Sequence, residues 1–333
     1  MKSVLLFINN LPWVVIGQVV LLRNMGHALH TEQSLKLSYV KILFDLSRGK
    51  QALLSICQPA LGAFFALGRV PDLHLLAIGI PAAACGYFAV FSLNDVLDVK
   101  ADKQALTSQS NPVDDGYDID VTFLRHPLAH GKISFRTSLA WVIGLALVSA
   151  TLAYILSPVS FLLFLGCVAL ETLYCALRSI TWLKTIISGI MVGLGGLAGW
   201  ATATPLTVAS LYLFLFLALW EIAGRNLPND LADVDSDRLV GIKTVATIFG
   251  GRVSSVATLI GALATLASIN TLPISLVPKL IIILLGAWAM VIPAILLVQV
   301  PSSTQAASYF NKASLLPSLA FIAIIPFMLL RSL

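Results

Sequence analysis

Charged residues are scarce in this sequence. Asp, Glu, Lys and Arg together make up 11% of the 333 residues, while 58% are hydrophobic. A water-soluble domain of this size carries about 25% charged residues. The shortage excludes a soluble globular protein and predicts an integral, multi-pass membrane protein embedded in the lipid bilayer. Basic residues in such a protein first set its topology, so the net charge of +5 does not indicate a nucleic-acid partner, and we expect none.

Cysteine is also rare, and its spacing excludes a cysteine-based metal site. The four cysteines are Cys57, Cys85, Cys167 and Cys175, and each lies within an apolar run. No two of them stand at a spacing typical of metal ligands. We therefore interpret all four as small hydrophobic residues of the core.

Long hydrophobic runs dominate the rest of the chain, and each is long enough to cross a bilayer as a helix. We predict an all-α membrane bundle of nine transmembrane helices near residues 51–70, 73–93, 138–157, 159–177, 185–203, 206–224, 253–272, 274–300 and 313–331. Residues 3–22 are interrupted by polar residues and are predicted to be an extra span, an interfacial helix or a signal-like segment. We expect residues 1–47 to form a membrane-associated or connecting segment and residues 48–333 the main domain.

Basic residues fall almost entirely on one side of this topology. If the residues before 51 are cytoplasmic, so are the loops after the second, fourth, sixth and eighth spans. These loops carry Lys100, Lys103, Arg125, Lys132, Arg136, Arg178, Lys184, Arg225, Arg238, Lys243, Arg252 and Lys312. The opposite side carries only Arg69, Lys279 and Arg331. The bias predicts that the loops rich in Lys and Arg face the cytoplasm, and we expect the protein in a bacterial inner membrane.

A nine-residue acidic pattern occurs twice in the chain. Residues 94–102 read Asn-Asp-Val-Leu-Asp-Val-Lys-Ala-Asp, and residues 229–237 read Asn-Asp-Leu-Ala-Asp-Val-Asp-Ser-Asp. We call these segments the first and the second Asp motif. Four predicted spans separate them, and because four is even, both motifs are predicted to lie on the cytoplasmic side.

Each motif holds three carboxylates at spacings i, i+3 and i+7, which on a helix lie on one face. Crowded carboxylates resist ionisation unless a cation neutralises them. Hard oxygen ligands suit Mg²⁺, which typically also binds substrate phosphates. We predict Mg²⁺ as the cofactor, which would bind a diphosphate between the two motifs. Its predicted ligands are Asp95, Asp98, Asp102, Asn229, Asp230, Asp233 and Asp237. For a single motif, solvated loop carboxylates are an equal alternative, but the repetition favours a site.

The two motifs resemble those of the UbiA superfamily of intramembrane prenyltransferases. The first motif is similar to the family's NDxxDxxxD pattern. The second, followed by Gly-Ile-Lys-Thr at 241–244, is similar to a DxxxD motif with a Gly-x-Lys-Thr/Ser stretch. Residues 127–134 (Pro-Leu-Ala-His-Gly-Lys-Ile-Ser) look like the family's R-P-L-x-x-G-R/K-I-S loop, and Tyr174 and Arg178 stand where the family has a Tyr and a Lys-Arg pair. The resemblance covers about residues 48–331.

The resemblance implies a metal-dependent alkylation. Mg²⁺ and basic residues stabilise a departing diphosphate, and the prenyl carbon gains carbocation character while an apolar cavity excludes water. The implied donor is a polyprenyl diphosphate, and the acceptor is an aromatic, quinone-precursor-like or other lipophilic molecule. Catalytic roles are implied for Asp98, Asp233 and Tyr174. Substrate-binding roles are implied for Asn94, Lys132, Arg178, Lys243 and Arg48.

The sequence departs from the family's pattern at a few positions. His126 stands where the loop usually has Arg, and Asn229 stands where the second motif often has its first Asp. Ionisable residues also fall inside predicted spans, where they are functional candidates. Glu171 is either such a group or a partner of another polar residue in the bundle. Glu221 and Arg225, four residues apart, are predicted to form a local ion pair.

Two other functions stay open. A terpene cyclase on the same scaffold would ionise the same diphosphate and quench the cation within the prenyl chain. A cation transporter would place acidic groups near the bilayer midplane, often in broken helices. Both Asp motifs stand at the ends of predicted spans, and this position favours an enzyme over a transporter.

Overall fold

The computed structural model describes residues 39–108, 119 and 121–330. The apolar run at residues 3–22, predicted to be an extra membrane segment, lies outside the described residues. Within the described ranges the secondary structure is helical and contains no strand, which confirms the predicted all-α class.

Eight helices in the described part of the chain are long and apolar enough to cross a membrane, so the chain is an integral, multi-pass membrane protein. Four of them are single helices of the first half: α6 (Leu73–Ser108), α7 (Phe135–Leu156), α8 (Pro158–Leu177) and α9 (Lys184–Ala201). The next is α10 (Val208–Trp220), continued by the π-helical turn η1 (Glu221–Asn226) and α11 (Leu227–Ala232). The last three are α14 (Gly251–Ile269); α15 (Leu276–Gly286) with η2 (Ala287–Val291) and α16 (Ile292–Gln299); and α17 (Ser303–Ala313) with α18 (Leu316–Leu330).

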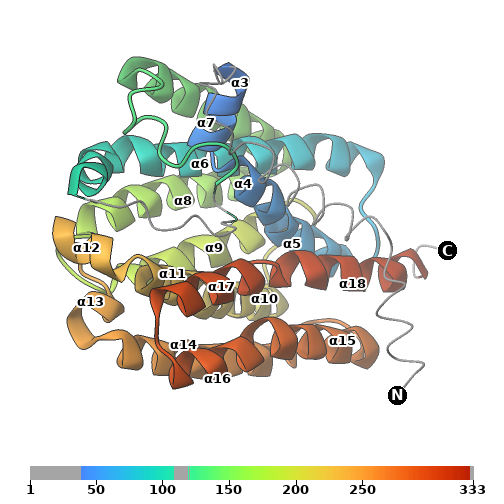
Figure 1. Ribbon diagram of the computed structural model, residues 1–333. Coiled ribbons are helices and arrows are strands. Elements are labelled where there is room, and N and C mark those ends of the chain that lie inside the picture. Colours follow the sequence, from blue (N-terminus) through green and yellow to red (C-terminus); the bar gives the residue numbers. More distant parts are fainter. Residues whose placement is uncertain (1–38, 109–118, 120, 331–333) are drawn as a thin grey trace.

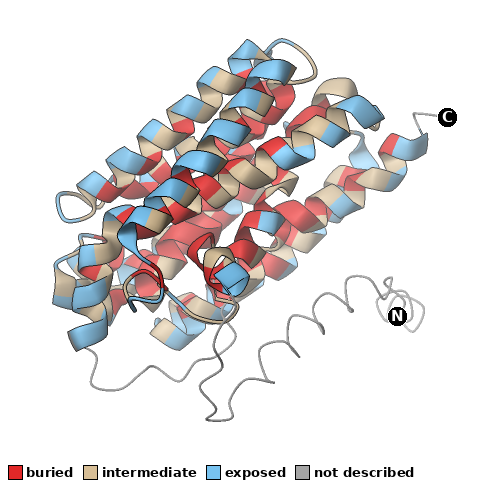
Figure 2. Ribbon diagram, turned by 90° about the horizontal axis from the view of Figure 1, so that it is seen from above, coloured by how far each residue is buried: buried red, intermediate tan, exposed pale blue. Residues whose placement is uncertain are grey.

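Five shorter helices complete the described part. They are α3 (Tyr39–Leu46), α4 (Gly49–Ser55), α5 (Cys57–Leu67), α12 (Val234–Val240) and α13 (Val245–Phe249). The long helices lie side by side, with α12 and α13 at one end of the bundle (Figure 1). Buried residues face the interior and exposed residues cover the outer faces (Figure 2). Many of those exposed residues are large and apolar, such as Leu147, Ile155 and Leu162, as expected where lipid replaces water as the solvent.

The helices differ from the predicted spans at several places: the last predicted span, 313–331, begins earlier, at Ser303, and three other differences adjoin the cavity described below. The predicted span 51–70 is two consecutive short helices, α4 and α5, which meet at Ile56. The predicted span 73–93 runs on as α6 to Ser108, so the first Asp motif is helical throughout. The span predicted at 206–224 continues through η1, where the Leu227 N–H bonds the Ile222 carbonyl. Pro228 follows and has no N–H to donate, which accounts for the widened turn before it.

Close packing of α5 against α9 depends on glycine. A Cβ added at Gly199 would lie 1.9 Å from the Pro59 carbonyl oxygen, and one at Gly62 would lie 2.2 Å from the Gly196 carbonyl oxygen. Both distances are far too short for a non-bonded contact between carbon and oxygen, so only glycine lets these backbones approach so closely.

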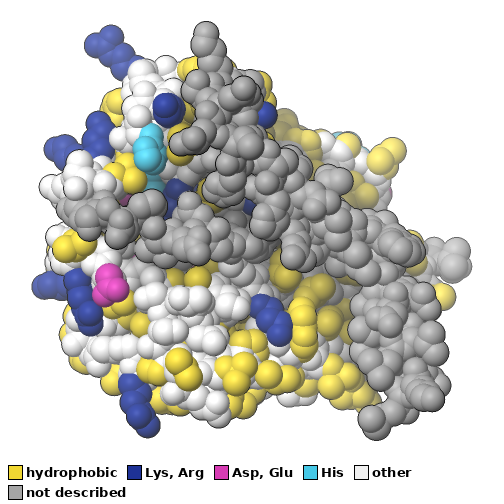
Figure 3. Space-filling view, in the orientation of Figure 1, with side chains coloured by type: hydrophobic (Ala, Val, Ile, Leu, Met, Phe, Trp, Pro, Cys, Tyr) yellow, Lys and Arg dark blue, Asp and Glu magenta, His cyan; other side chains and the backbone are white. Residues whose placement is uncertain are grey.

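Charged side chains gather at one end of the bundle. Most of the Lys and Arg side chains visible in Figure 3 lie at the end that carries α12 and α13. There α12 packs against α6, so the second Asp motif comes to the first. The short helix α3 packs against α4 and α6, so residues 39–46 are part of the bundle.

Candidate active site

A cavity of ≈ 340 Å³ follows the inner face of α6. Its lining residues on that helix run from Leu75 to Asp98, about 35 Å at 1.5 Å per residue. This length is comparable to the hydrocarbon core of a bilayer, about 30 Å. Most of the wall is apolar, and the carboxylates Asp98 and Asp237 lie at the end where the two Asp motifs meet. The cavity therefore joins a charged mouth to a long apolar interior.

The first Asp motif contributes one continuous helical face to this mouth. Asp98 lines the cavity and forms an ion pair with Arg178 from the end of α8. Asp95 is buried, and its Oδ1 lies 3.6 Å from the Arg48 guanidinium. Arg48 also donates a hydrogen bond of 3.0 Å to the Asn94 amide oxygen. The predicted spacing thus places the carboxylates on one helix, and Arg48, Arg178 and Asn94 lie beside them.

The second Asp motif is broken in the middle. α11 ends at Ala232 and α12 begins at Val234, and Asp233 between them has φ −94° and ψ 12°. Asp230 is buried and pairs with Lys184 at 3.2 Å, and both Asp230 and Asp237 line the cavity. Burial, and then the neighbouring carboxylates of Asp230 and Asp233, raise the pKa of Asp237 to about 8. An unneutralised carboxylate is therefore unfavourable at this position.

Residues 121–134 cross between the two motifs, and we call them the bridging loop. Arg125 donates a 3.1 Å hydrogen bond to Asp233. His126 Nδ1 lies 3.5 Å from Asp95 Oδ1 and 3.2 Å from Asp102 Oδ2. Burial alone would lower the pKa of His126, but the contacts with Asp102 and Asp95 outweigh it and raise the pKa to about 9.

The bridging loop is held from outside the cavity by α3. The buried carboxylate of Asp45 accepts hydrogen bonds from the Phe123 N–H (3.1 Å) and the Leu124 N–H (2.8 Å). These two amides immediately precede Arg125 and His126. Asp45 therefore fixes the stretch of backbone that presents both side chains to the Asp motifs.

A polar row on α8 faces the same cavity. Glu171 accepts a 2.8 Å hydrogen bond from the Asn94 amide and lines the cavity beside Tyr174 and Arg178. The Tyr174 hydroxyl accepts hydrogen bonds from Lys184 (3.1 Å) and from Asn226 (3.3 Å). Glu171, Tyr174 and Arg178 therefore span the mouth of the cavity, and Glu171 has a polar partner.

Some predicted site residues stand back from the cavity. Lys132 and Lys243 are exposed, although the Lys243 N–H bonds the Arg178 carbonyl at 2.8 Å and so supports that residue's backbone. Asn229 and Asp233 are absent from the lining formed by the described residues, and the Asn229 amide donates to Asp233 instead. These residues surround the mouth rather than form its inner wall.

Two basic residues in the cavity wall lack a predicted site role. Lys184 is 3% exposed and pairs with Asp230, but the predicted span began at 185, which made Lys184 look like a loop charge. Arg225 pairs with Glu221 at 3.1 Å, as predicted. Both members of that pair are buried and line the cavity beyond the Asp motifs. Of these residues only Glu221 stood inside a predicted span, and that position was the available signal.

The donor set fits a hard divalent cation. Carboxylates of both motifs converge at the cavity mouth, and oxygen ligands of this kind suit Mg²⁺. Asp95 Oδ1 and Asp230 Oδ2 are buried and have no hydrogen-bond partner among the described residues. Buried carboxylate oxygens without a partner are costly, and a cation at each motif would relieve that cost.

The sequence of this chain is similar to the sequences of two named enzymes. A protein from Thermococcus sibiricus named digeranylgeranylglyceryl phosphate synthase is 26% identical over 245 residues, 67% of this chain and 76% of that protein. A 4-hydroxybenzoate octaprenyltransferase from Hydrogenovibrio crunogenus is 30% identical over 207 residues, 60% of this chain and 65% of that protein.

The same fold occurs in a solved structure of a UbiA homolog from Archaeoglobus fulgidus bound to DMAPP and Mg²⁺. It has a TM-score of 0.60 and 19% identity, covering 85% of this chain and 98% of that one. A sequence model of the UbiA prenyltransferase family matches residues 56–323, which is most of the chain. The chain therefore belongs to the UbiA prenyltransferase family and is an enzyme of that family.

Proposed function

We propose that this enzyme transfers a prenyl group from a polyprenyl diphosphate to an aromatic, quinone-precursor-like acceptor in a reaction that depends on Mg²⁺. The observation that carries the proposal is the cavity itself, which joins a mouth of carboxylates and basic groups to an apolar interior as long as a bilayer is thick. A diphosphate with a long prenyl tail has the same division between a charged head and an apolar chain.

The charged groups at the mouth are suited to the diphosphate. We assign Arg48 and Arg178, which line the cavity, to binding its oxygens. Lys132 and Lys243 remain candidates for binding it from the exposed rim. When bound by the carboxylates of the two Asp motifs, Mg²⁺ supplies Lewis-acid stabilisation of the charge that develops on the leaving diphosphate.

The apolar part of the cavity orients the prenyl chain and excludes water from the carbon that loses the diphosphate. Tyr87 and Phe91 line it between the mouth and the apolar interior. The faces of aromatic rings attract cations, so these two rings are placed to stabilise positive charge on the prenyl group. Tyr174 closes the wall at the mouth through its bonds with Lys184 and Asn226.

An aromatic acceptor is supported by the relative named 4-hydroxybenzoate octaprenyltransferase. The relative named digeranylgeranylglyceryl phosphate synthase favours a second candidate, an isoprenoid glycerol phosphate as acceptor. Both acceptors carry an acidic group and an attacking oxygen or ring carbon. A direct comparison of the two decides between them.

The decisive experiment incubates the purified full chain with Mg²⁺, prenyl diphosphates of several lengths and a panel of both acceptor types. Mass spectrometry should detect a prenylated aromatic product that disappears when Mg²⁺ is chelated. Detection of a prenylated glycerol phosphate instead would show that the acceptor is the second candidate, an isoprenoid glycerol phosphate. A cyclic hydrocarbon or terpene alcohol formed without any acceptor would overturn the transferase proposal in favour of a cyclase.

We also propose that the active site faces the cytoplasm of a bacterium with the chain in its inner membrane, and that residues 48–333 form the catalytic domain. Support comes from the one-sided distribution of Lys and Arg. A cysteine introduced at Lys132 should be protected from a membrane-impermeant thiol reagent in intact spheroplasts, whereas one at Lys279 should react. The reverse labelling pattern would contradict this orientation.

A further inference from the structure

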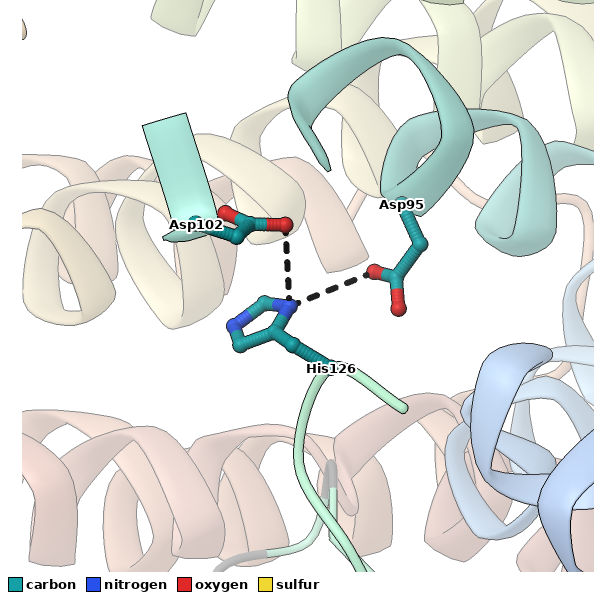
Figure 4. A group of neighbouring side chains, drawn as sticks. All are labelled: Asp95, Asp102 and His126. Atoms are coloured by element: carbon teal, nitrogen blue, oxygen red, sulfur yellow. Dashed lines mark ion pairs between the residues drawn. The ribbon is translucent and has the colours of Figure 1, made fainter. Parts of the chain in front are cut away.

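Three side chains meet beneath the bridging loop. Asp95 and Asp102 project from α6 about two helical turns apart, and the His126 imidazole lies between them (Figure 4). One ligand atom from each residue lies within 4.8 Å of the other two. Carboxylate oxygens and an imidazole nitrogen at such separations are a metal-ligand set, and it contains a nitrogen that a purely acidic motif lacks.

The position of His126 is imposed by its surroundings. The residue has φ +51°, a left-handed conformation that is uncommon for residues other than glycine. The backbone is fixed before it by Asp45, through the Phe123 and Leu124 amides, and after it by the bond from His130 N–H to the His126 carbonyl (3.1 Å). A strained residue pinned on both sides indicates that the orientation of its ring matters.

The contacts of His126 leave polar atoms unsatisfied. Nδ1 lies at ion-pair distance from both carboxylates, yet a single N–H can donate to only one of them at a time. Asp95 is 3% exposed, and its Oδ1 and His126 Nδ1 are both buried atoms with no hydrogen-bond partner among the described residues. A cation bound by both oxygens and by the Nδ1 lone pair would satisfy every one of these atoms.

We propose that His126 is a nitrogen ligand of the metal ion held by Asp95 and Asp102. The inference rests on the metal-dependent function proposed above and adds a ligand from outside either Asp motif. Because an imidazole nitrogen suits transition metals better than Mg²⁺, this ligand makes the first site bind Mn²⁺ more tightly, relative to Mg²⁺, than an all-oxygen site would.

Pulsed electron paramagnetic resonance of bound Mn²⁺ tests the proposal directly. The purified full chain is loaded with one equivalent of Mn²⁺, and the spectrum is searched for modulation by a coordinated ¹⁴N nucleus. The wild-type chain should show this modulation, and His126→Gln should lose it. His130→Gln is the matched control, since this exposed histidine lies on the same loop and its loss should leave the modulation unchanged.

Calorimetry supplies the second readout. In His126→Gln the ratio of Mn²⁺ to Mg²⁺ affinity should fall by about tenfold or more, while Mg²⁺ still binds and shows that the variant is folded. Mn²⁺ bound to the wild-type chain without nitrogen modulation would overturn the role of His126 and leave the proposed function intact. Failure of the wild-type chain to bind either metal would overturn both.

Discussion

The two Asp motifs share one sequence pattern and yet have different structures. The first lies on an unbroken helix, α6, so its three carboxylates keep a single face. The second is divided at Asp233, so Asp230 turns inward to Lys184 while Asp233 turns outward to Arg125. The comparison teaches that the spacing of acidic residues indicates a site, whereas the helix that carries them decides which carboxylates reach it.

The largest expected effect is on stability, and it concerns Lys184, which pairs with Asp230 of the second motif. Lys184→Met leaves the Asp230 carboxylate buried without its cation, and breaking a buried pair in this way costs about 3–5 kcal/mol of stability. The unfolding temperature of the detergent-solubilised chain should therefore fall strongly. The double variant Lys184→Met/Asp230→Asn should recover much of the loss, and equal instability of both variants would contradict the pairing argument.

The next difference concerns activity. Asp98 lines the cavity and Asp233 does not, among the described residues. We expect Asp98→Asn to lower kcat by at least about a hundredfold, since it removes charge where the leaving group departs. Asp233→Asn should lower kcat by about tenfold or less. Steady-state kinetics of prenyl transfer measure both, and an equal loss would mean that the break at Asp233 does not separate the carboxylates functionally.

A smaller effect is expected at the anchor of the bridging loop, which joins the motifs. Burial raises the pKa of Asp45 from 3.8 to about 6, against the opposing effect of its backbone hydrogen bonds. The folded protein therefore binds this proton more tightly than the unfolded chain, and stability falls as the pH rises from about 4 to about 6. Thermal unfolding across this range should show the fall in the wild-type chain and a flatter profile in Asp45→Asn. An unchanged profile would mean that Asp45 does not titrate there.

The smallest effect should follow loss of the Arg125–Asp233 contact. The side chains are 48% and 28% exposed, and an exposed pair contributes less than about 1 kcal/mol. Arg125→Ala should change KM for the diphosphate by about fivefold or less, and the change should shrink at high salt. A larger, salt-independent loss would show that Arg125 binds substrate.

Much of the fold followed from the sequence because lipid imposes a simple rule. Apolar runs of about 20 residues must be helices, and eight long helices lie where spans were predicted. The first predicted span differed because hydrophobicity does not reveal a break such as that between α4 and α5. The even number of spans between the Asp motifs correctly brought them to one end of the bundle.

The site was less accessible to sequence reasoning. Spacing identified the carboxylates on α6, because they repeat with the helix, whereas Tyr174 and Arg178 were identified by their resemblance to family positions. The break at Asp233 has no glycine or proline at that residue to mark it. Lys184 gained its role from a partner 46 residues away, and His126 from partners on another element. Such contacts depend on tertiary packing and leave no local pattern.

The anchor on α3 has a practical consequence for where the working enzyme begins. Family similarity starts at residue 56, and every predicted catalytic residue lies beyond residue 47. A shortened chain that starts at Arg48 would keep all of those residues and all the long helices. It would lack the Asp45 carboxylate, and with it the two hydrogen bonds that set the approach of Arg125 and His126 to the Asp motifs. The proposed catalytic domain, residues 48–333, thus depends for this part of its geometry on a residue upstream of it.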